Sequence, residues 1–328
     1  MLKPVADELS KNHEVIWFMR DKDVALQIAD ENGLTYTLVS AASKGLIGNA
    51  MEFAANIFRC AFFTFKYDID IWVTKYGSAN IAAKIFGRKS IAFNDDDADV
   101  VPLIASTSYP FADSVLVPDV TRMGRFENKA RRYPGSHELF YLHPNRFSPN
   151  PDIYELLGIP EDQRFCLIRL SALTAHHDIG IKGIGNEFVR EIVKVCGEDV
   201  RVFISSEAPI DKEFEVFRLC IPVSRIFDAL YYAEFLVADS QTMTSEAGTI
   251  GTASFRISDF VGKISYIAEL EKYGLSFGYK PGESENALSQ IKVAVAAPDY
   301  KQASRERLED FLDVKCDPVP WFAQQITR

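Results

Sequence analysis

The stretch Phe235-Leu-Val-Ala-Asp-Ser-Gln-Thr-Met-Thr-Ser-Glu-Ala247 shows most clearly how this chain folds. Its apolar start, residues 235–238, is typical of a short strand that is buried on both faces. The polar residues Asp239 and Ser240 end this run and lead into a helical pattern over 242–251. A buried strand, a polar loop and a helix in succession form the repeating unit of a parallel α/β sheet.

The same unit recurs on both sides of this stretch. In the second half of the chain, further strands are predicted at 165–170, 200–204 and 253–257, with helices at 186–196, 225–232, 264–273, 285–296 and 303–312. In the first half, strands are predicted at 15–19, 35–39, 69–74, 90–93 and 114–117, with helices at 2–12, 23–32, 46–65 and 78–86. This alternation predicts parallel sheets with helices on both faces.

Two domains are expected, because the chain has 328 residues and a single core usually stops growing near ~250–300. Residues 133–160 are rich in proline and poor in periodicity, which is typical of a linker. We predict two Rossmann-like α/β domains facing across a cleft, an N-terminal one over 1–145 and a C-terminal one over 146–312. Trp321 and Phe322 are aromatic anchors in a polar tail, so residues 313–328 are predicted to cross back to the first domain.

The first domain has an unusual start. A doubly wound domain normally opens with a strand, whereas this sequence opens within the helical pattern at 2–12. We therefore expect the first strand of the N-terminal sheet to be missing. Either the domain manages without that strand, or the true start lies upstream of Met1.

Composition excludes several functional classes. With 36 Lys and Arg against 46 Asp and Glu, the formal net charge is −10, which argues against a nucleic-acid binder. Five dispersed cysteines without a CxxC spacing suit a reducing cytoplasm and predict no metal site. Neither a phosphate-binding GxxxxGK[ST] loop nor a GxSxG nucleophile elbow occurs. The N-terminus lacks the apolar core of a signal peptide, so a cytoplasmic location is expected.

The helix predicted over 46–65 carries an apolar face. The spacing favours packing of this face against the sheet. A second interpretation is a surface that touches the inner face of a membrane, because aromatic residues and basic side chains lie together there. The face comprises Ile47, Met51, Ala54, Phe58, Ala61 and Phe65, and the second interpretation rests on Phe62, Phe63, Lys44, Arg59 and Lys66.

Ligands of parallel α/β sheets bind beyond the carboxyl ends of the strands, so residues that follow strands are candidate site residues. After the strand at 235–238, Ser240, Gln241 and Thr242 bring hydroxyl and backbone N–H groups to a helix start, which suits an anion. Glu246 lies a turn further on, where its carboxylate can accept hydrogen bonds from two vicinal hydroxyls. The alternative is that Ser240 or Thr242 only caps the helix.

The pattern Asp239-Ser-Gln-Thr-Met-Thr-Ser-Glu-Ala247 looks like the C-terminal nucleotide-binding loop of GT-B-fold proteins. It is similar to the Asp-Ser-Gly-Gly-x-x-Glu-Glu-Ala motif of UDP-N-acetylglucosamine 2-epimerases. The resemblance implies that Ser240 and Thr242 contact the diphosphate and Glu246 the ribose, with Gln241 and Ser245 in the same loop. The chain departs from the epimerase motif at 241 and 242, where the epimerases carry glycines that allow close backbone approach.

Over nearly its whole length the chain more closely resembles an uncharacterised GT-B-like family of bacteria and archaea, domain-of-unknown-function family 354. That family is not specific for a reaction. The segments that carry the resemblance are Ser136–Pro144, Ala175–Asp178, Leu230–Ala233, Ser245–Ala247 and Glu269–Gly274.

The loop after the strand at 165–170 is a second candidate. Arg169, His176, His177 and Lys182 could hold a diphosphate or shuttle a proton. The predicted catalytic residues of this loop are His176, His177 and Asp178. The histidines beside Asp178 also suggest a metal, but adjacent residues seldom ligate one ion together, so none is predicted. The alternative is a polar loop without a role.

In the first domain, Asp95 follows the strand at 90–93 and is the predicted base for an acceptor hydroxyl. The alternative for its acidic run is a solvated turn. After the strand at 69–74, Gly77 and Ser78 open a helix and could bind an acceptor or the donor sugar, or merely form its cap. His137 and Glu138 lie in the linker and could line the hinge of the cleft, or have a structural role only.

The sequence thus predicts a glycosyltransferase that uses a nucleotide-diphosphate sugar as substrate, without a cofactor, in surface-polysaccharide or glycolipid biosynthesis. The expected partners are the nucleotide sugar, a lipid-linked or saccharide acceptor, and the membrane surface as a peripheral contact. A nucleotide-sugar 2-epimerase would use the same binding loop without an acceptor. A non-catalytic sugar-nucleotide-binding or scaffold protein is the third hypothesis.

Overall fold

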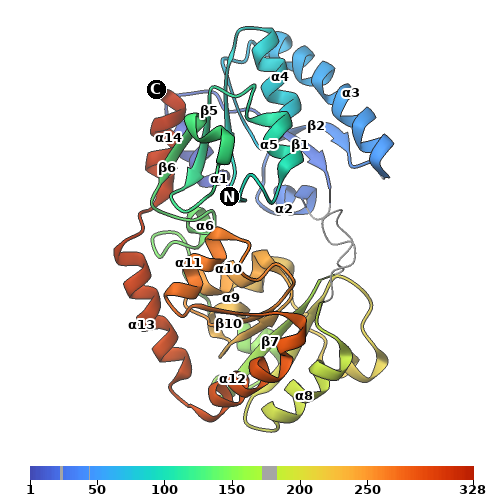
Figure 1. Cartoon of the computed structure of the whole chain (residues 1–328), viewed down its shortest axis with the longest axis vertical. Helices are drawn as coiled ribbons and strands as arrows, with labels where there is room; N and C mark the ends of the chain where they lie inside the picture. Colours follow the sequence, from blue (N-terminus) through green and yellow to red (C-terminus); the bar gives the residue numbers. More distant parts are fainter. Residues whose placement is uncertain (23–24, 44, 172–182) are drawn as a thin grey trace. The chain divides into compact units, whose positions relative to one another are not determined.

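A computed structural model of the chain describes residues 1–22, 25–43, 45–171 and 183–328 (Figure 1). These residues form two compact units. The first comprises 1–140 together with 317–328, and the second comprises 141–316. Every recorded strand pairing in both units is parallel, as the alternation of strands and helices predicts.

The strands of the first unit form two sheets. β1 (Trp17–Asp21) pairs with β2 (Tyr36–Ala41) in a two-stranded sheet. A four-stranded sheet has the order β3 (Ile71–Thr74), β4 (Lys89–Phe93), β5 (Ser114–Pro118), β6 (Ala130–Tyr133). The helices are α1 (Lys3–Leu9), α2 (Ala25–Glu31), α3 (Gly45–Lys66), α4 (Gly77–Ile85) and α5 (Pro102–Ser108), with a 3₁₀ helix at Gly124–Lys129 and α6 (Leu139–Leu142) at the end of the unit.

The two sheets of the first unit are joined by side chains. Within the described residues, β1 has no strand partner except β2, and β3 has none except β4. The ring of Phe18 on β1 lies 5.0 Å from the ring of Trp72 on β3 and 4.9 Å from that of Phe63 on α3, between centroids. Aromatic packing, rather than a ladder of backbone hydrogen bonds, therefore connects β1 to β3.

The C-terminal helix α14 (Pro318–Thr327) completes the core of the first unit. Phe322, which is fully buried, packs edge-on against Phe93, Tyr133 and Phe140, with ring centroids 4.9–6.2 Å apart. Asp317 begins the helix by accepting a hydrogen bond from the backbone N–H of Val319 (3.0 Å). Phe322 thus fills the interior beside the ends of β4 and β6, and the half-buried Trp321 packs on Tyr133.

The second unit has one five-stranded sheet in the order β11 (Ser276–Tyr279), β10 (Ser254–Ile257), β9 (Leu236–Ala238), β7 (Phe165–Leu170), β8 (Arg201–Ser206). Two apolar clusters cover the two faces of this sheet, and they contain alternate residues of the central strands: Ile168 and Val237 in one, Leu167 and Leu236 in the other. The helices are α7 (Ile153–Leu157), α8 (Asn186–Cys196), α9 (Ile226–Tyr232), α10 (Gln241–Thr249), α11 (Ser265–Lys272), α12 (Ser284–Ala296) and α13 (Tyr300–Asp313), with 3₁₀ helices at Lys212–Phe217, Val223–Arg225 and Pro281–Glu283.

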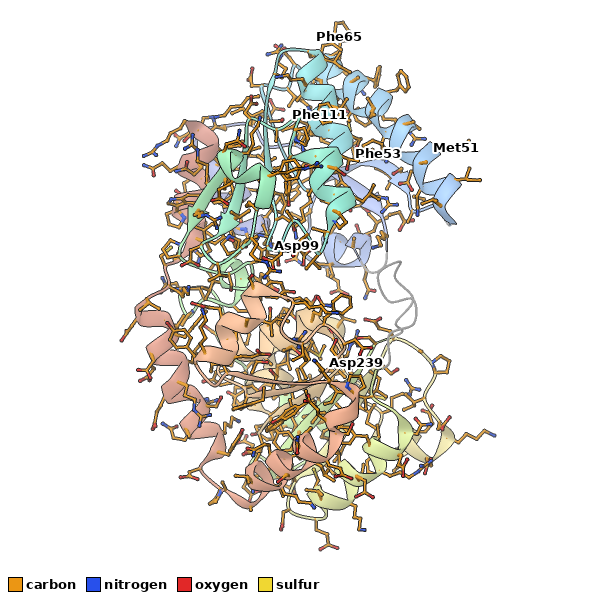
Figure 2. All side chains as sticks on the ribbon, viewed as in Figure 1. Met51, Phe53, Phe65, Asp99, Phe111 and Asp239 are labelled. Atoms are coloured by element: carbon orange, nitrogen blue, oxygen red, sulfur yellow. The ribbon has the colours of Figure 1, made fainter. Side chains whose placement is uncertain are left out.

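The prediction that α3 packs its apolar face against the sheet is wrong. Met51 and Phe65 point outward from the helix (Figure 2) and are 70% and 77% exposed. The buried residues of α3 are instead Glu52, Asn56, Cys60 and Thr64, at steps of four residues, and all but the cysteine are distinctly polar.

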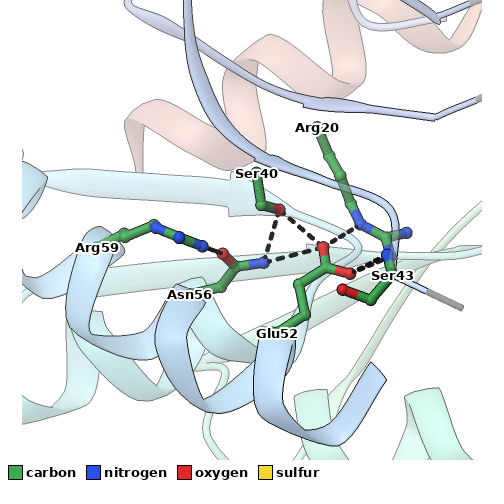
Figure 3. A network of polar contacts seen from close by, with 6 residues as sticks. All are labelled: Arg20, Ser40, Ser43, Glu52, Asn56 and Arg59. Carbon is green, nitrogen blue, oxygen red and sulfur yellow. Dashed lines mark hydrogen bonds and ion pairs between the residues drawn. The ribbon is translucent and has the colours of Figure 1, made fainter. Parts of the chain in front are cut away.

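A hydrogen-bond network explains why the polar face of α3 turns inward (Figure 3). Arg20 on β1 donates to both carboxylate oxygens of Glu52 (2.6 and 2.8 Å). The Ser40 hydroxyl on β2 and the Ser43 backbone N–H also donate to this carboxylate (2.7 and 2.8 Å). Asn56 donates in turn to Ser40 (3.0 Å). Because a buried carboxylate needs such partners, the residues beneath the helix decide its orientation.

Candidate functional site

The carboxyl ends of β3, β4 and β6 bring three charged or titratable side chains together. Lys75 directly follows β3, Asp95 follows β4, and His137 lies shortly after β6. Lys75 Nζ and His137 Nδ1 both donate to Asp95 Oδ1, each at 2.9 Å. The predicted candidate Asp95 is therefore the centre of a constellation, and His137, which the sequence placed at a hinge, belongs to it.

The side chains of this constellation are largely withdrawn from water, so the interactions between their charges are strong. The side chain of His137 is 6% exposed, Asp95 is 15% exposed and Lys75 is 37% exposed. The rings of Phe93 and Phe140 meet the imidazole of His137 edge-on. Nε2 of His137 is buried and has no hydrogen-bond partner among the described residues. Lys75 and Asp95 thus carry the accessible part of the cluster, with His137 behind them.

The charge states follow from these contacts. Burial by itself raises the pKa of Asp95, but the charges and hydrogen bonds of His137 and Lys75 outweigh it and leave the pKa lowered. Burial lowers the pKa of His137, because the charged imidazolium loses its solvation there. His137 donates through Nδ1–H to an ionised Asp95, and Lys75 donates to the same carboxylate oxygen. Because its pKa is low, the Asp95 carboxylate is better suited to act as an ionised hydrogen-bond acceptor than to hold a proton.

Backbone contacts fix the loop that carries Asp95. The side-chain oxygen of Asn94 accepts from the backbone N–H of Asp95 (3.1 Å), and the amide of Asn94 donates to the Tyr109 hydroxyl (2.9 Å). The Thr121 hydroxyl donates to the backbone carbonyl of Asp95 (3.3 Å). Asp95 is therefore held in a structured loop. The alternative that the sequence allowed, a solvated turn, does not describe this residue.

The start of α4 is packed rather than open. Ser78 is 5% exposed, and a Cβ on Gly77 would come within 2.2 Å of the Thr107 carbonyl oxygen. Gly77 is therefore required for the close approach of the start of α4 to the backbone of the last turn of α5. Among the residues after β3, Lys75 and Tyr76 therefore stay accessible, whereas Ser78 does not.

In the second unit, the chain order reverses beside β7. β8 follows β7 on one side, and β9 then pairs with β7 on the other side. Such a reversal is where open α/β sheets bind ligands. The loop after β9, residues 239–240, and the start of α10 lie at this reversal.

The predicted nucleotide-binding residues differ in their contacts and in how far their side chains are exposed to solvent. The Ser240 hydroxyl caps α10 by accepting from the Met243 backbone N–H (3.3 Å), as the alternative interpretation holds. Thr242 is exposed, and Gln241 is half-buried. Ser245 is fully buried, so it has no exposed atom to offer a nucleotide.

Glu246 has a partner that the sequence did not indicate. The Tyr141 hydroxyl donates to Glu246 Oε1 (2.9 Å), although the two residues are 105 positions apart. This bond orients a half-buried carboxylate at the first turns of α10. Long sequence separation hides such a pair, and no local pattern at Tyr141 reveals it.

Asp239 has a structural role that the sequence pattern does not reveal. It is buried and accepts from the backbone N–H of Ser171 (2.7 Å) and of Ile184 (3.3 Å). Burial raises the pKa of Asp239, against the lowering effect of these backbone donors. Asp239 therefore ties the loop after β9 to the backbone on both sides of residues 172–182.

The remaining predicted residues lie nearby or outside the described part of the chain. Arg169 on β7 donates to Ser205 (2.7 Å) and to the carboxylate of Glu207, so its charge is already paired. His176, His177, Asp178 and Lys182 fall outside the described residues. Within the residues that are described, no group of three or more His, Cys, Asp or Glu side chains could hold a metal ion. In the same residues, no helix is long and apolar enough to cross a membrane.

Solved structures share this fold over nearly the whole chain. A UDP-N-acetylglucosamine 2-epimerase is 14% identical with a TM-score of 0.66, and the match covers 99% of this chain and 90% of that one. The spinosyn forosaminyltransferase SpnP is 14% identical with a TM-score of 0.63, covering 100% and 95%. S. aureus MnaA, in a structure with UDP, is 10% identical with a TM-score of 0.65, covering 99% and 91%.

The protein therefore has the two-domain α/β fold of GT-B glycosyltransferases and UDP-N-acetylglucosamine 2-epimerases, which confirms the predicted fold class. At these identities the likeness shows the fold alone. No protein-family model matches the chain, and no curated protein matches its sequence. The resemblance to domain-of-unknown-function family 354 thus stays a hypothesis.

Proposed function

We propose that the protein is a GT-B-like glycosyltransferase that takes its sugar from a nucleotide-diphosphate sugar, in the assembly of a surface polysaccharide or glycolipid. The observation that carries this proposal is the position of residues 239–246 beside the chain reversal at β7 and β9. Open parallel sheets bind ligands at such a reversal. The shared fold with nucleotide-sugar enzymes supports the proposal at the level of analogy.

The second unit is assigned the nucleotide. Backbone N–H groups at the start of α10 and the positive end of its dipole suit the diphosphate. The carboxylate of Glu246, oriented by Tyr141, accepts hydrogen bonds from the ribose hydroxyls. Arg169 reaches the diphosphate by exchanging its Glu207 partner for phosphate, which is also a bidentate acceptor for guanidinium.

The first unit is assigned the acceptor. Asp95 accepts a hydrogen bond from the acceptor hydroxyl and orients it, while Lys75 and His137 hold the carboxylate in place. As the acceptor oxygen bonds to the anomeric carbon, the bond from that carbon to the diphosphate breaks. The acceptor oxygen then carries positive charge and becomes strongly acidic, so even a carboxylate of low pKa can take its proton. The negative charge of Asp95 also stabilises positive charge that develops on the sugar.

A nucleotide-sugar 2-epimerase is the second candidate. The similarity of residues 239–247 to the epimerase motif and the epimerases among the structural neighbours favour it. The chemistry differs in one measurable respect, because an epimerase turns over without an acceptor. His176, His177 and Asp178 stay predicted catalytic residues for either reaction.

The test begins with binding. A thermal-shift panel of nucleoside diphosphates and their sugars should reveal the ligand, because a ligand present at 100 times its Kd adds about 2.7 kcal/mol to the free energy of unfolding. Product analysis with and without saccharide or lipid-linked acceptors follows. Turnover only with an acceptor supports the transferase, and turnover without one supports the epimerase. Binding without turnover supports a non-catalytic scaffold, and no binding to any nucleotide overturns the proposal.

A further inference from the structure

Helix α3 presents a continuous apolar stripe to solvent. Ile47, Met51, Phe58, Phe62 and Phe65 are 58–77% exposed. At 100° per residue these five positions fall within a narrow sector of the helix. The first and last of them are 18 positions apart, which corresponds to about 27 Å along the axis. Single apolar residues scattered over a protein surface are normal. A contiguous stripe of large apolar side chains of this length instead marks an interaction surface.

Rotation of α3 about its axis cannot bury this stripe. Its opposite face carries Glu52, whose carboxylate is buried and bonded to Arg20, Ser40 and the Ser43 backbone. The hydrogen bonds of Arg20 lower the pKa of Glu52 to about 2, against the raising effect of burial. Further along the same face, Trp72 Nε1 donates to Thr64 (2.9 Å). These contacts within the first unit hold the opposite face of α3 inward and therefore keep the stripe exposed.

The charges beside the stripe identify its partner. The charged residues of α3 are Glu52, Arg59 and Lys66, and the only acid among them is the buried one. Arg59 and Lys66 are exposed, and Lys66 Nζ lies 6.0 Å from the centre of the Phe62 ring. In a chain of net charge −10, the exposed surface of this helix thus combines apolar side chains with positive charge alone. That combination suits the headgroups and acyl boundary of an anionic bilayer.

A second copy of the chain fits this surface less well. A two-fold contact between two α3 helices would bring four cations to one interface, while the acid of each helix stays buried on the opposite face. A spanning helix is also excluded for α3, which at 22 residues is long enough but is not apolar enough to cross a membrane. The geometry that remains is a helix lying in the plane of the membrane surface.

We propose that α3 is a membrane-docking helix that binds anionic bilayers, with the stripe from Ile47 to Phe65 inserted at the boundary between headgroups and acyl chains. Arg59 and Lys66 contact anionic headgroups at its edge. This inference does not depend on the sugar chemistry proposed above, because docking is measured without any nucleotide.

The experiment is sedimentation of the full chain with vesicles of phosphatidylcholine alone and of phosphatidylcholine with 30% phosphatidylglycerol. The wild type should bind the anionic vesicles, and binding should weaken in high salt. Phe58→Ser with Phe65→Ser should reduce the partition coefficient at least tenfold. Arg59→Gln with Lys66→Gln should reduce it about fivefold per charge on anionic vesicles only.

The matched control is Val216→Ser with Val293→Ser, two exposed apolar residues of the second unit, which should bind like the wild type. Circular dichroism melts show whether each variant is folded, and all four substituted α3 side chains are exposed. The proposal is overturned if the wild type ignores anionic vesicles, or if the Phe58/Phe65 variant binds them equally well. Light scattering that shows a dimer split by the same variant would also overturn it, since the stripe would then join two copies.

Discussion

The carboxyl ends of the four-stranded sheet in the first unit and of the five-stranded sheet in the second assemble their polar groups in different ways. In the first unit, Lys75, Asp95 and His137 come from three separate loops and meet as a buried charged cluster. In the second unit, one continuous stretch, residues 239–246, supplies a buried anchor, a helix cap and a half-buried carboxylate. The first arrangement depends on charges that stabilise one another, whereas the second depends on the backbone of one helix start. Substitutions should therefore affect folding at the first site and ligand affinity at the second.

The largest effect is expected for Asp95→Asn. This substitution leaves Lys75 and the Nδ1–H of His137 facing a neutral acceptor in a buried setting. Removing one partner of a buried pair typically costs about 3 kcal/mol of the free energy of unfolding, which urea denaturation measures. Asp99→Asn is the matched control, because Asp99 is exposed and pairs with Arg122 at the surface. The control should change by less than about 0.5 kcal/mol, and equal small effects at both positions would remove the distinction between the two sites.

Glu246→Gln is expected to weaken nucleotide binding by about 1.5–3 kcal/mol, the scale of a hydrogen bond to a charged group. The melting temperature of the unliganded protein should change little, because the amide keeps the shape and still accepts from Tyr141. Calorimetric titration with the nucleoside diphosphate found in the binding panel measures the affinity. Tyr141→Phe, which removes only the orienting hydroxyl, should lose less. If Glu246→Gln lowers stability and leaves affinity unchanged, Glu246 supports the helix and does not hold a ribose.

The pH dependence of stability should report on His137. Because burial lowers the pKa of His137 in the folded state, the unfolded chain takes up its proton at a higher pH than the folded protein. The free energy of unfolding should thus fall as the pH drops below about 6.5, by at most about 1.4 kcal/mol per pH unit. His137→Asn keeps a donor but cannot titrate, so its pH profile should be flatter between pH 5 and 8. Identical profiles would mean that His137 is solvated in solution.

The smallest effect is expected at the helix start. Ser240→Ala removes the hydroxyl that accepts from Met243 and should cost about 1 kcal/mol of stability. Thr242→Ala changes an exposed side chain and should cost less than about 0.5 kcal/mol. Unfolding curves without ligand measure both. A loss of nucleotide affinity for Thr242→Ala alone would assign the phosphate contact to Thr242 and the cap to Ser240.

The sequence could indicate the second site better than the first for a physical reason. A helix start with Ser240, Thr242 and Glu246 is contiguous, so spacing alone places these residues on neighbouring turns. Asp95 could be selected because it follows a strand, but its partners Lys75 and His137 lie 20 and 42 positions away in the sequence. Only the order of strands in the sheet brings their loops together. The Tyr141–Glu246 bond escaped prediction for the same reason.

The sequence by itself determined the alternation of strands and helices, the parallel sheets and the loop after β9, because these follow from the period of apolar residues and from turn chemistry along the chain. The tertiary structure decided the orientation of α3. Its apolar spacing predicted an inward face, but Arg20 on β1 and Ser40 on β2 lie where Glu52 needs partners. A buried carboxylate without partners costs more than exposed apolar side chains do. Which strands lie beneath a helix is not encoded in the period of that helix, so this choice could be read only from the folded protein.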